Sequence, residues 1–457
     1  MRTIFRICAP LASLAYWLLF SAPLHAALTA QNVLVVVNTN SADSVAIGNF
    51  YTNLHPGAKI VKVGTTTAAE ITRPDFFSEI RDPIRTYLNS TAGLPTQIVS
   101  IVTTRGVPYQ LHGAPSEGLV GGQADYASVD SELALLWQNM DSGTTFSNAY
   151  PANCAVLNPY WLNAPYSPIS SFSRANIQTL KNWSPLIWSN NYSTVVFETP
   201  SYPFNGSNAF GFFTKSTEPS ANQVTPGDLY LVTRLSGYSV ADVTNSILRA
   251  QNIQINKSND VIVLNKGGQN FDGGIYANAR DILTNAGFNV LFDQTGTMVS
   301  NLPPGQRLLS YSTYGIYMSV NSGPRYIYSN SFTYAPGAIF NSYESFNGTE
   351  FTSPTNGRTQ GQVADWFNVG GTLGFGHVNE PFTFSVANED VYLPNLLING
   401  FSWAEAAYAS LPVISWENVV LGDPLATFSL VPEPSGLLYW IAVGFLFQSL
   451  RWRRRHR

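Results

Sequence analysis

The feature that most constrains the fold is a repeated order of apolar runs and amphipathic segments, which begins with NVLVVVN at 32–38. A continuous apolar run of this kind predicts a strand buried on both faces of a parallel sheet. A helix is expected next, with Ser41 or Asp43 as its N-cap, ending at Pro56-Gly57. The pattern continues with a strand at KIVKVG, a helix over 73–88 kinked at Pro83, and a strand within 97–108.

The same alternation resumes in the second part of the chain. Further strands are expected in DLYLVTRL, NDVIVLN, FNVLFD, RLLSYSTYG, GAIFNSYES, TLGFGH and VVLGDPLATF, and helices in VADVTNSILRAQNI, GGIYANARDILTNAG, QGQVADWFNVGG and SWAEAAYASL. We therefore predict an α/β fold, a mostly parallel sheet flanked by helices, as one body over 27–430. Residues 113–226 lose the pattern and are expected to form a long irregular insertion. Residues 33–54 and 261–283 resemble each other too weakly to establish a repeat.

The N-terminal end has the properties of a secretory signal peptide. Arg2 and Arg6 precede the apolar LASLAYWLLF, and SAPLHA follows with Ala26 at a plausible cleavage position. A first membrane helix that stays in place is the alternative, but the run is short and Pro23 follows it. We predict a signal peptide over 1–26 and an exported chain.

The C-terminal end combines a short motif, an apolar run and a basic cluster. The motif is Val431, Pro432, Glu433 and Pro434, and the apolar segment covers 436–450. This segment is expected to span the membrane, extended by flanking tryptophans and by arginines whose stems reach the interface. The basic cluster should stay cytoplasmic and consists of Arg451, Arg453, Arg454 and Arg455.

The order of these three features resembles the PEP-CTERM sorting signal of Gram-negative bacteria. In that family the motif is recognised by an exosortase, a membrane transpeptidase-like enzyme, and the tail is removed near the motif. The resemblance implies export machinery and an exosortase as partners, with a transient anchor in the inner membrane. It also implies a final location at the cell surface or outside the cell. An ordinary tail anchor with a chance Pro-Glu-Pro is the alternative.

Charge argues against a nucleic-acid partner for the exported body. The whole chain has 24 Lys and Arg against 28 Asp and Glu, a net charge of −4. Seven arginines and one glutamate lie in the two ends, so the body is more acidic than the whole chain. An acidic body with few charges lacks the basic surface that nucleic acid or an anionic membrane requires. Its aromatic side chains are a possible platform for polysaccharide.

The segment GFGHVNEP contains the strongest candidates for chemistry. His377 and Glu380 follow an apolar segment at a predicted strand end, where α/β folds place their sites. An imidazole beside a carboxylate is suited to general base catalysis or to a metal site. Tyr314 and Ser345 stand at the ends of neighbouring strands and complete this group. A structural histidine is the alternative, and we expect no metal and no cofactor because the histidines lack the spacing of a zinc motif.

Further strand ends supply other polar candidates. They are Asn38, Thr104-Arg105-Gly106, Thr233-Arg234 and Asn265-Lys266-Gly267-Gly268. A small acidic group, Asp125, Asp130 and Glu132, could meet a cation. The simpler interpretation makes Asp130 a helix N-cap, with Glu132 in the first turn.

The body also resembles known proteins. VTTRGVP, SVDSELALL, PGAI, GHVNEP and VVLGDPL are similar to blocks of an uncharacterised family of exported bacterial proteins. More distantly, the chain resembles the caspase/gingipain-like fold, itself related to Rossmann-like sheets. That fold carries His-Gly where Tyr314-Gly315 stands here, and a cysteine where 342–345 has none. The resemblance implies the fold without cysteine-peptidase chemistry.

Two functions follow from the sequence. The first is an exported, non-catalytic protein of the cell surface or the extracellular polysaccharide matrix. The second is a degenerate or atypical hydrolase with a site near Tyr314, Ser345, His377 and Glu380.

Overall fold

The computed structural model describes the body of the chain. The described residues are 28–112, 126–138, 156–163, 167–181, 186–188, 212–214, 224–267, 272, 274–315, 331–353, 360–381 and 383–431. Within these ranges no helix is long and apolar enough to cross a membrane. The predicted signal peptide, the apolar segment 436–450 and the arginine cluster all lie outside them.

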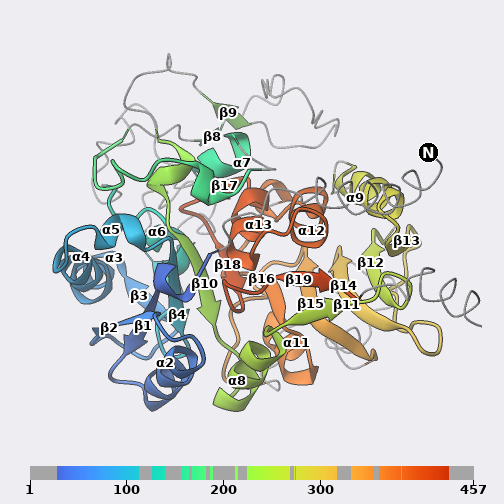
Figure 1. Ribbon diagram of the computed structural model, residues 1–457, viewed down its shortest axis with the longest axis horizontal. Coiled ribbons are helices and arrows are strands. Elements are labelled where there is room, and N and C mark those ends of the chain that lie inside the picture. Colours follow the sequence, from blue (N-terminus) through green and yellow to red (C-terminus); the bar gives the residue numbers. More distant parts are fainter. Residues whose placement is uncertain are drawn as a thin grey trace, which may run out of the picture.

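One large sheet organises the described residues (Figure 1). Its ten strands, in spatial order, are β13 (Asn289–Asp293), β12 (Asp260–Asn265), β14 (Arg307–Thr313), β15 (Tyr334–Ser342), β16 (Leu373–His377), β18 (Asn418–Leu421), β10 (Leu231–Leu235), β4 (Ser100–Thr104), β1 (Val33–Asn38) and β2 (Lys59–Val63). The predicted α/β fold with a mostly parallel sheet is confirmed.

The sheet consists of two parallel halves with β18 between them. β2, β1, β4 and β10 are parallel to one another, and so are β13, β12, β14, β15 and β16. β18 pairs antiparallel with β16, with Gly374 opposite Leu421 and His377 opposite Asn418, and it meets β10 at the single pair of Arg234 and Leu421. Helices α8 and α11, which follow β10 and β15, begin side by side at Tyr238 and Asp365 and end side by side at Arg249 and Gly371, so the carboxyl ends of both halves lie on one side of the sheet. In each half the first strand lies between the second and the third. The two halves thus share one topology, which the weak resemblance between 33–54 and 261–283 reflects.

Helices cover both faces of the sheet. One face carries α2 (Ala42–Leu54), α8 (Val240–Arg249) and α11 (Val363–Val369). The other carries α4 (Asp82–Asn89), α6 (Val129–Leu133), α9 (Ile275–Asn285), α12 (Glu389–Leu397) and α13 (Trp403–Ser410). The apolar residues of β1 pack on both faces of the sheet. Val35 packs with α2 and α8, whereas Val36 packs in the cluster beneath α4. A strand buried in this way needs apolar residues at every position.

Shorter elements complete the described body. The small sheets are β11 (Ile253–Ile255) with β19 (Phe428–Leu430), β3 (Glu70–Thr72) with β5 (Gln110–His112) and β6 (Tyr126–Ser128), β17 (Val413–Ile414) with β7 (Val156–Leu157), and β8 (Leu186–Trp188) with β9 (Phe212–Thr214). The short helices are α3 (Arg73–Asp75), α5 (Leu94–Gln97) and α7 (Pro159–Asn163).

Most predicted elements are present, with informative differences. Ser41 caps α2 by accepting a hydrogen bond from the Ser44 amide, so the first of the two predicted caps is correct. The predicted helix 73–88 is divided into α3, a π-helical turn over 76–81 and α4. Pro83 occupies the first turn of α4, where its missing N–H is tolerated. Helix α12 was not predicted, because its buried carboxylates gave it no amphipathic pattern.

Residues 126–138 belong to the predicted insertion, where the sequence indicates one helical stretch at SVDSELALLWQNM. This segment places β6 and α6 against the sheet, and Val129 and Leu133 are fully buried. Ser128, and not Asp130, caps α6, because its hydroxyl accepts the Ser131 amide.

Asp130 instead forms a buried ion pair with Arg234 of β10. Arg234 Nε lies 2.8 Å from Asp130 Oδ2, and its Nη2 lies 2.7 Å from Oδ1. Nη1 and Nη2 also donate to the carbonyl oxygens of Val107 and Pro108, and the Thr103 hydroxyl donates to Asp130. Neither side chain is more than 2% exposed. With each charge fully partnered, the cost of burying it is offset only while both residues remain.

We predict that Arg234→Met or Asp130→Asn lowers the free energy of unfolding by about 3–5 kcal/mol, because each leaves a buried partner without its counter-charge. Urea titration of the full chain measures the effect. Asp281→Asn is the matched control, since Asp281 pairs with Arg280 at an exposed position and the expected loss is below about 1 kcal/mol. Equal losses in the buried and exposed pairs would contradict the assignment.

Candidate functional site

The predicted strand-end residues form two groups, one in each half of the sheet. Asn38 and Arg105 lie at the carboxyl ends of β1 and β4, in the first half. Tyr314, Ser345 and His377 lie at the carboxyl ends of β14, β15 and β16, in the second half. Segments that follow β15 and β16 contact the segment that follows β4, because the Tyr109 hydroxyl donates to the Thr349 carbonyl oxygen and the Gln110 amide donates to the Val378 carbonyl oxygen at 2.6 Å. The two groups therefore lie on the same side of the sheet.

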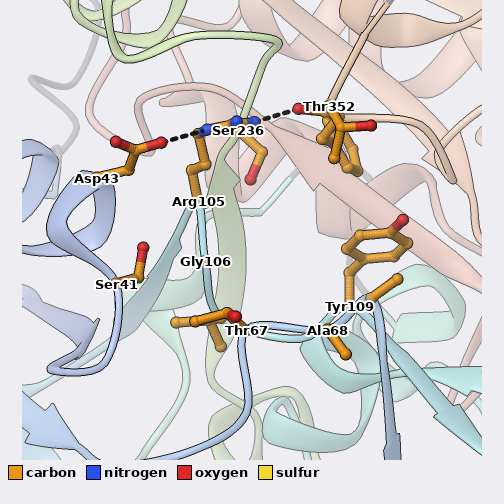
Figure 2. Close-up of a pocket in the computed structure, with 12 residues that line it drawn as sticks. Ser41, Asp43, Thr67, Ala68, Arg105, Gly106, Tyr109, Ser236 and Thr352 are labelled. Carbon is orange, nitrogen blue, oxygen red and sulfur yellow. Dashed lines mark hydrogen bonds and ion pairs between the residues drawn. The ribbon is translucent and has the colours of Figure 1, made fainter.

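A cavity of about 230 Å³ lies at the carboxyl edge of the first half. It opens above β1, β4 and β10, where the chain crosses from β1 to one side and from β4 to the other. Such a reversal of strand order leaves a crevice, and open α/β sheets bind ligands there. The lining residues are Ser41, Asp43, Thr67, Ala68, Ala69, Arg105, Gly106, Val107, Tyr109, Ser236, Phe351 and Thr352. Figure 2 shows the labelled side chains arranged around an open centre.

Arg105 holds the walls of this cavity together. Its Nε donates to Asp43 Oδ2 at 2.9 Å, and its Nη1 donates to the carbonyl oxygen of Gly237 at 2.6 Å. Nη1 also donates to the carbonyl oxygen of Phe351, from the loop that follows β15 (Figure 2). Three chain segments thus meet on one guanidinium group, which is 19% exposed.

Gly106 permits the close approach of the β4 exit loop to α2. Its φ of +92° lies in the left-handed region. A Cβ atom at this position would lie 2.2 Å from the Ser41 hydroxyl oxygen. Only glycine fits both the backbone and the contact. The strand-end pattern pointed to Arg105 and Gly106, but it did not identify them as a site, because Phe351 and Ser236 come from distant parts of the chain.

His377 lies at the end of β16, as predicted, and it is fully buried. Its Nδ1 lies 2.9 Å from the Glu344 carbonyl oxygen, which assigns the ring proton to Nδ1. Its Nε2 is buried and has no partner among the described residues. Burial lowers the pKa of His377 to about 4, so the ring is neutral at pH 7. A substrate has no path to this ring through the described residues.

Ser345 and Glu380 come together, whereas Tyr314 and His377 are engaged elsewhere. The Ser345 hydroxyl donates to Glu380 Oε2. The Tyr314 hydroxyl donates to the Gly296 carbonyl oxygen at 3.2 Å, and its ring covers Gly267. Within the described part of the chain, no hydrogen bond joins Ser345 to His377. The arrangement therefore lacks the bond between nucleophile and base that covalent catalysis uses.

Glu417 is a buried carboxyl group that the sequence gave no reason to select. It precedes β18 and is fully buried, and neither of its oxygens has a partner among the described residues. Burial is the main cause that raises its pKa well above the usual value, and the nearby Glu380 adds to the effect. Burial of this carboxyl group therefore favours its neutral form.

A second buried carboxyl group, Glu389, begins α12 beneath the sheet. The Asn341 amide donates to its Oε1 at 2.7 Å, while Oε2 has no partner among the described residues. Burial raises the pKa of Glu389 to about 8, and the nearby Asp390 and Asp272 contribute to the rise. The group is thus largely neutral at pH 7.

The described residues offer no metal centre, because no three His, Cys, Asp or Glu side chains among them are grouped to hold an ion. Asp130 and Glu132 are instead paired with Arg234 and Arg73.

Comparisons of the chain with protein-family models, with curated proteins and with solved structures gave no match. The geometry of the cavity and of the two groups of strand-end residues is therefore the basis for a functional proposal.

We predict that Glu389→Gln removes part of the pH dependence of stability. The pKa of Glu389 is raised on folding, so its contribution is intact below about pH 4.5 and is lost as the pH rises toward about 8. The loss is about 1.4 kcal/mol per pH unit in this window. Urea titrations at pH 5 and pH 8 should show a smaller difference for Glu389→Gln than for the unmodified chain.

The exposed Asp281 provides the control for this measurement, because it pairs with Arg280, which stays charged throughout this pH range. Asp281→Asn should leave the difference between pH 5 and pH 8 unchanged. An unchanged difference in Glu389→Gln as well would show that Glu389 is ionised in the folded protein.

Proposed function

We propose that this chain is an exported, non-catalytic binding protein, sorted by an exosortase and retained at the cell surface or in the extracellular polysaccharide matrix. The observation that carries the non-catalytic part is the composition of the cavity at the carboxyl ends of β1, β4 and β10. Its lining includes Arg105 and Asp43, paired with each other, together with hydroxyl and apolar side chains, but no His or Cys. Such a lining binds through hydrogen bonds and lacks a group suited to proton transfer near pH 7.

The end of the folded body supports the sorting part. Strand β19 ends at Leu430 and pairs with β11, and the Val431 amide donates to the Ile255 carbonyl oxygen. Val431, the first residue of the VPEP motif, is 41% exposed. Removal of the tail near the motif would therefore leave every described strand intact.

We expect the cells that make this protein to remove its tail. Mass spectrometry of the surface or medium fraction should find a chain that ends near 431–434 and begins near Ala27. A double substitution of Glu433→Gln and Pro434→Ala should leave the tail attached and the protein in the inner membrane. Glu70→Gln, far from the motif, is the control. Full-length chain in the cytosol with both ends uncut would overturn the proposal.

The alternative function, an atypical hydrolase, is favoured by one observation, the contact of Ser345 with Glu380 near Glu417, a carboxyl group whose pKa is raised by burial. Two carboxyl groups in different environments are a common arrangement for acid–base catalysis. The burial of His377 and Glu417 weighs against this function.

We predict no turnover of peptidase, esterase or glycosidase substrate panels by the purified full chain. Glu380→Gln, Ser345→Ala and His377→Gln separate a real activity from a contaminant. Turnover that is present in the unmodified protein and abolished in any of these folded variants would establish the hydrolase and exclude the non-catalytic proposal.

A further inference from the structure

The cavity at the carboxyl edge of β1, β4 and β10 carries unused hydrogen-bonding groups of both kinds. Arg105 makes its hydrogen bonds through Nε and Nη1, and no described residue accepts from its Nη2. Asp43 uses Oδ2 for Arg105, and its Oδ1 accepts from no described residue. The Ser236 hydroxyl, in a residue only 3% exposed, also has no partner among the described residues. The cavity therefore offers a ligand a donor, an acceptor and a hydroxyl, from three residues that all line it (Figure 2).

The paired charges of Arg105 and Asp43 disfavour the binding of ionic ligands in the cavity. An anion would find the Arg105 charge already neutralised by Asp43 at 2.9 Å, and it would face the exposed oxygen of that carboxylate. A cation would face the guanidinium group in the same way. Like charges brought together on binding weaken association, so both kinds of ion are disfavoured.

The remaining walls suit a small ring with an apolar face. The Tyr109 ring lines the cavity and meets Phe351 edge to face at 5.1 Å between ring centres. Thr67 adds a hydroxyl on the opposite wall (Figure 2). The volume of about 230 Å³ is below the range of about 300–1,000 Å³ for sites that bind drug-sized molecules. It fits one compact ring of a larger molecule, because the cavity opens to solvent at Asp43, which is 46% exposed.

We propose that this cavity binds one neutral sugar ring through two neighbouring hydroxyl groups. One hydroxyl accepts from Arg105 Nη2 and donates to Ser236, while the next donates to Asp43 Oδ1. The apolar face of the ring lies against Tyr109. This inference deepens the proposed function and rests on it only for the source of the sugar, since binding in solution does not depend on export.

Calorimetric titration of the full chain in detergent tests the proposal. The neutral probes are the methyl glycosides of glucose, galactose and mannose, and the charged probes are glucuronate, glucosamine and inorganic phosphate. At least one neutral glycoside should bind saturably and more tightly than any charged probe. Tighter binding of a charged probe, or no binding of the three glycosides, would overturn the proposal.

Two variants locate the binding in the cavity. Arg105→Met should weaken the neutral glycoside roughly 10-fold or more, because a hydrogen bond from a charged donor is lost. Asp43→Asn keeps an acceptor for Arg105 but leaves a positive charge, so the ratio of glucuronate affinity to neutral affinity should rise roughly 10-fold. Arg280→Met, which alters an exposed pair on α9, is the matched control and should bind as the unmodified chain does.

Thermal melting of each variant checks that it is folded. If Arg105→Met does not fold, the selectivity change in Asp43→Asn decides the question alone, and an unchanged ratio would overturn the proposal. A chain found uncut in the cytosol that still binds a glycoside would refute the sorting proposal and leave this inference intact. An exported chain that binds no glycoside would overturn this inference and leave the sorting proposal intact.

Discussion

The buried pair of Arg234 and Asp130 is the interaction on which the first half of the structure depends. It joins β10 to α6, and it fixes the exit of β4 through the carbonyl oxygens of Val107 and Pro108. That exit loop also carries Arg105, which lines the cavity. The ion pair therefore fixes the position of this part of the cavity wall without lining the cavity itself. A buried charge tolerates few alternative positions, because each lost hydrogen bond exposes the full cost of desolvation. The cavity is thus preorganised by a contact that no ligand touches.

One loop links the two halves of the sheet. After β15 the Gly348 amide donates to the His377 carbonyl oxygen, on the second half. A few residues later the Phe351 carbonyl oxygen accepts from Arg105, on the first half. The loop passes the junction of β16 and β18, where Gly348 lies against Gly376 and Val419. The buried polar groups at the end of β16 and the cavity beside β4 therefore share a structural support.

The sequence predicted some parts of the candidate site and not others. It placed His377 at a strand end and Arg105 after β4, because apolar runs that stop at polar residues mark strand ends. It could not show that His377 is buried, since the atoms that cover it come from 344–348 and from the strand opposite. Glu417 and Glu389 carried no signal, because a single carboxylate in a short segment reads as a surface residue.

The sequence by itself determined where most of the strands and helices form, because the period of apolar residues and the capping residues act over a few positions. It also determined the order of motif, apolar run and arginines on which the sorting proposal rests. Only the tertiary structure decided that β18 lies between the two halves of the sheet and pairs antiparallel with β16. It also decided that Phe351, which follows β15, meets Arg105, which follows β4, and so completes the cavity. Both arrangements depend on contacts between residues distant in the chain, and these leave no period in the sequence.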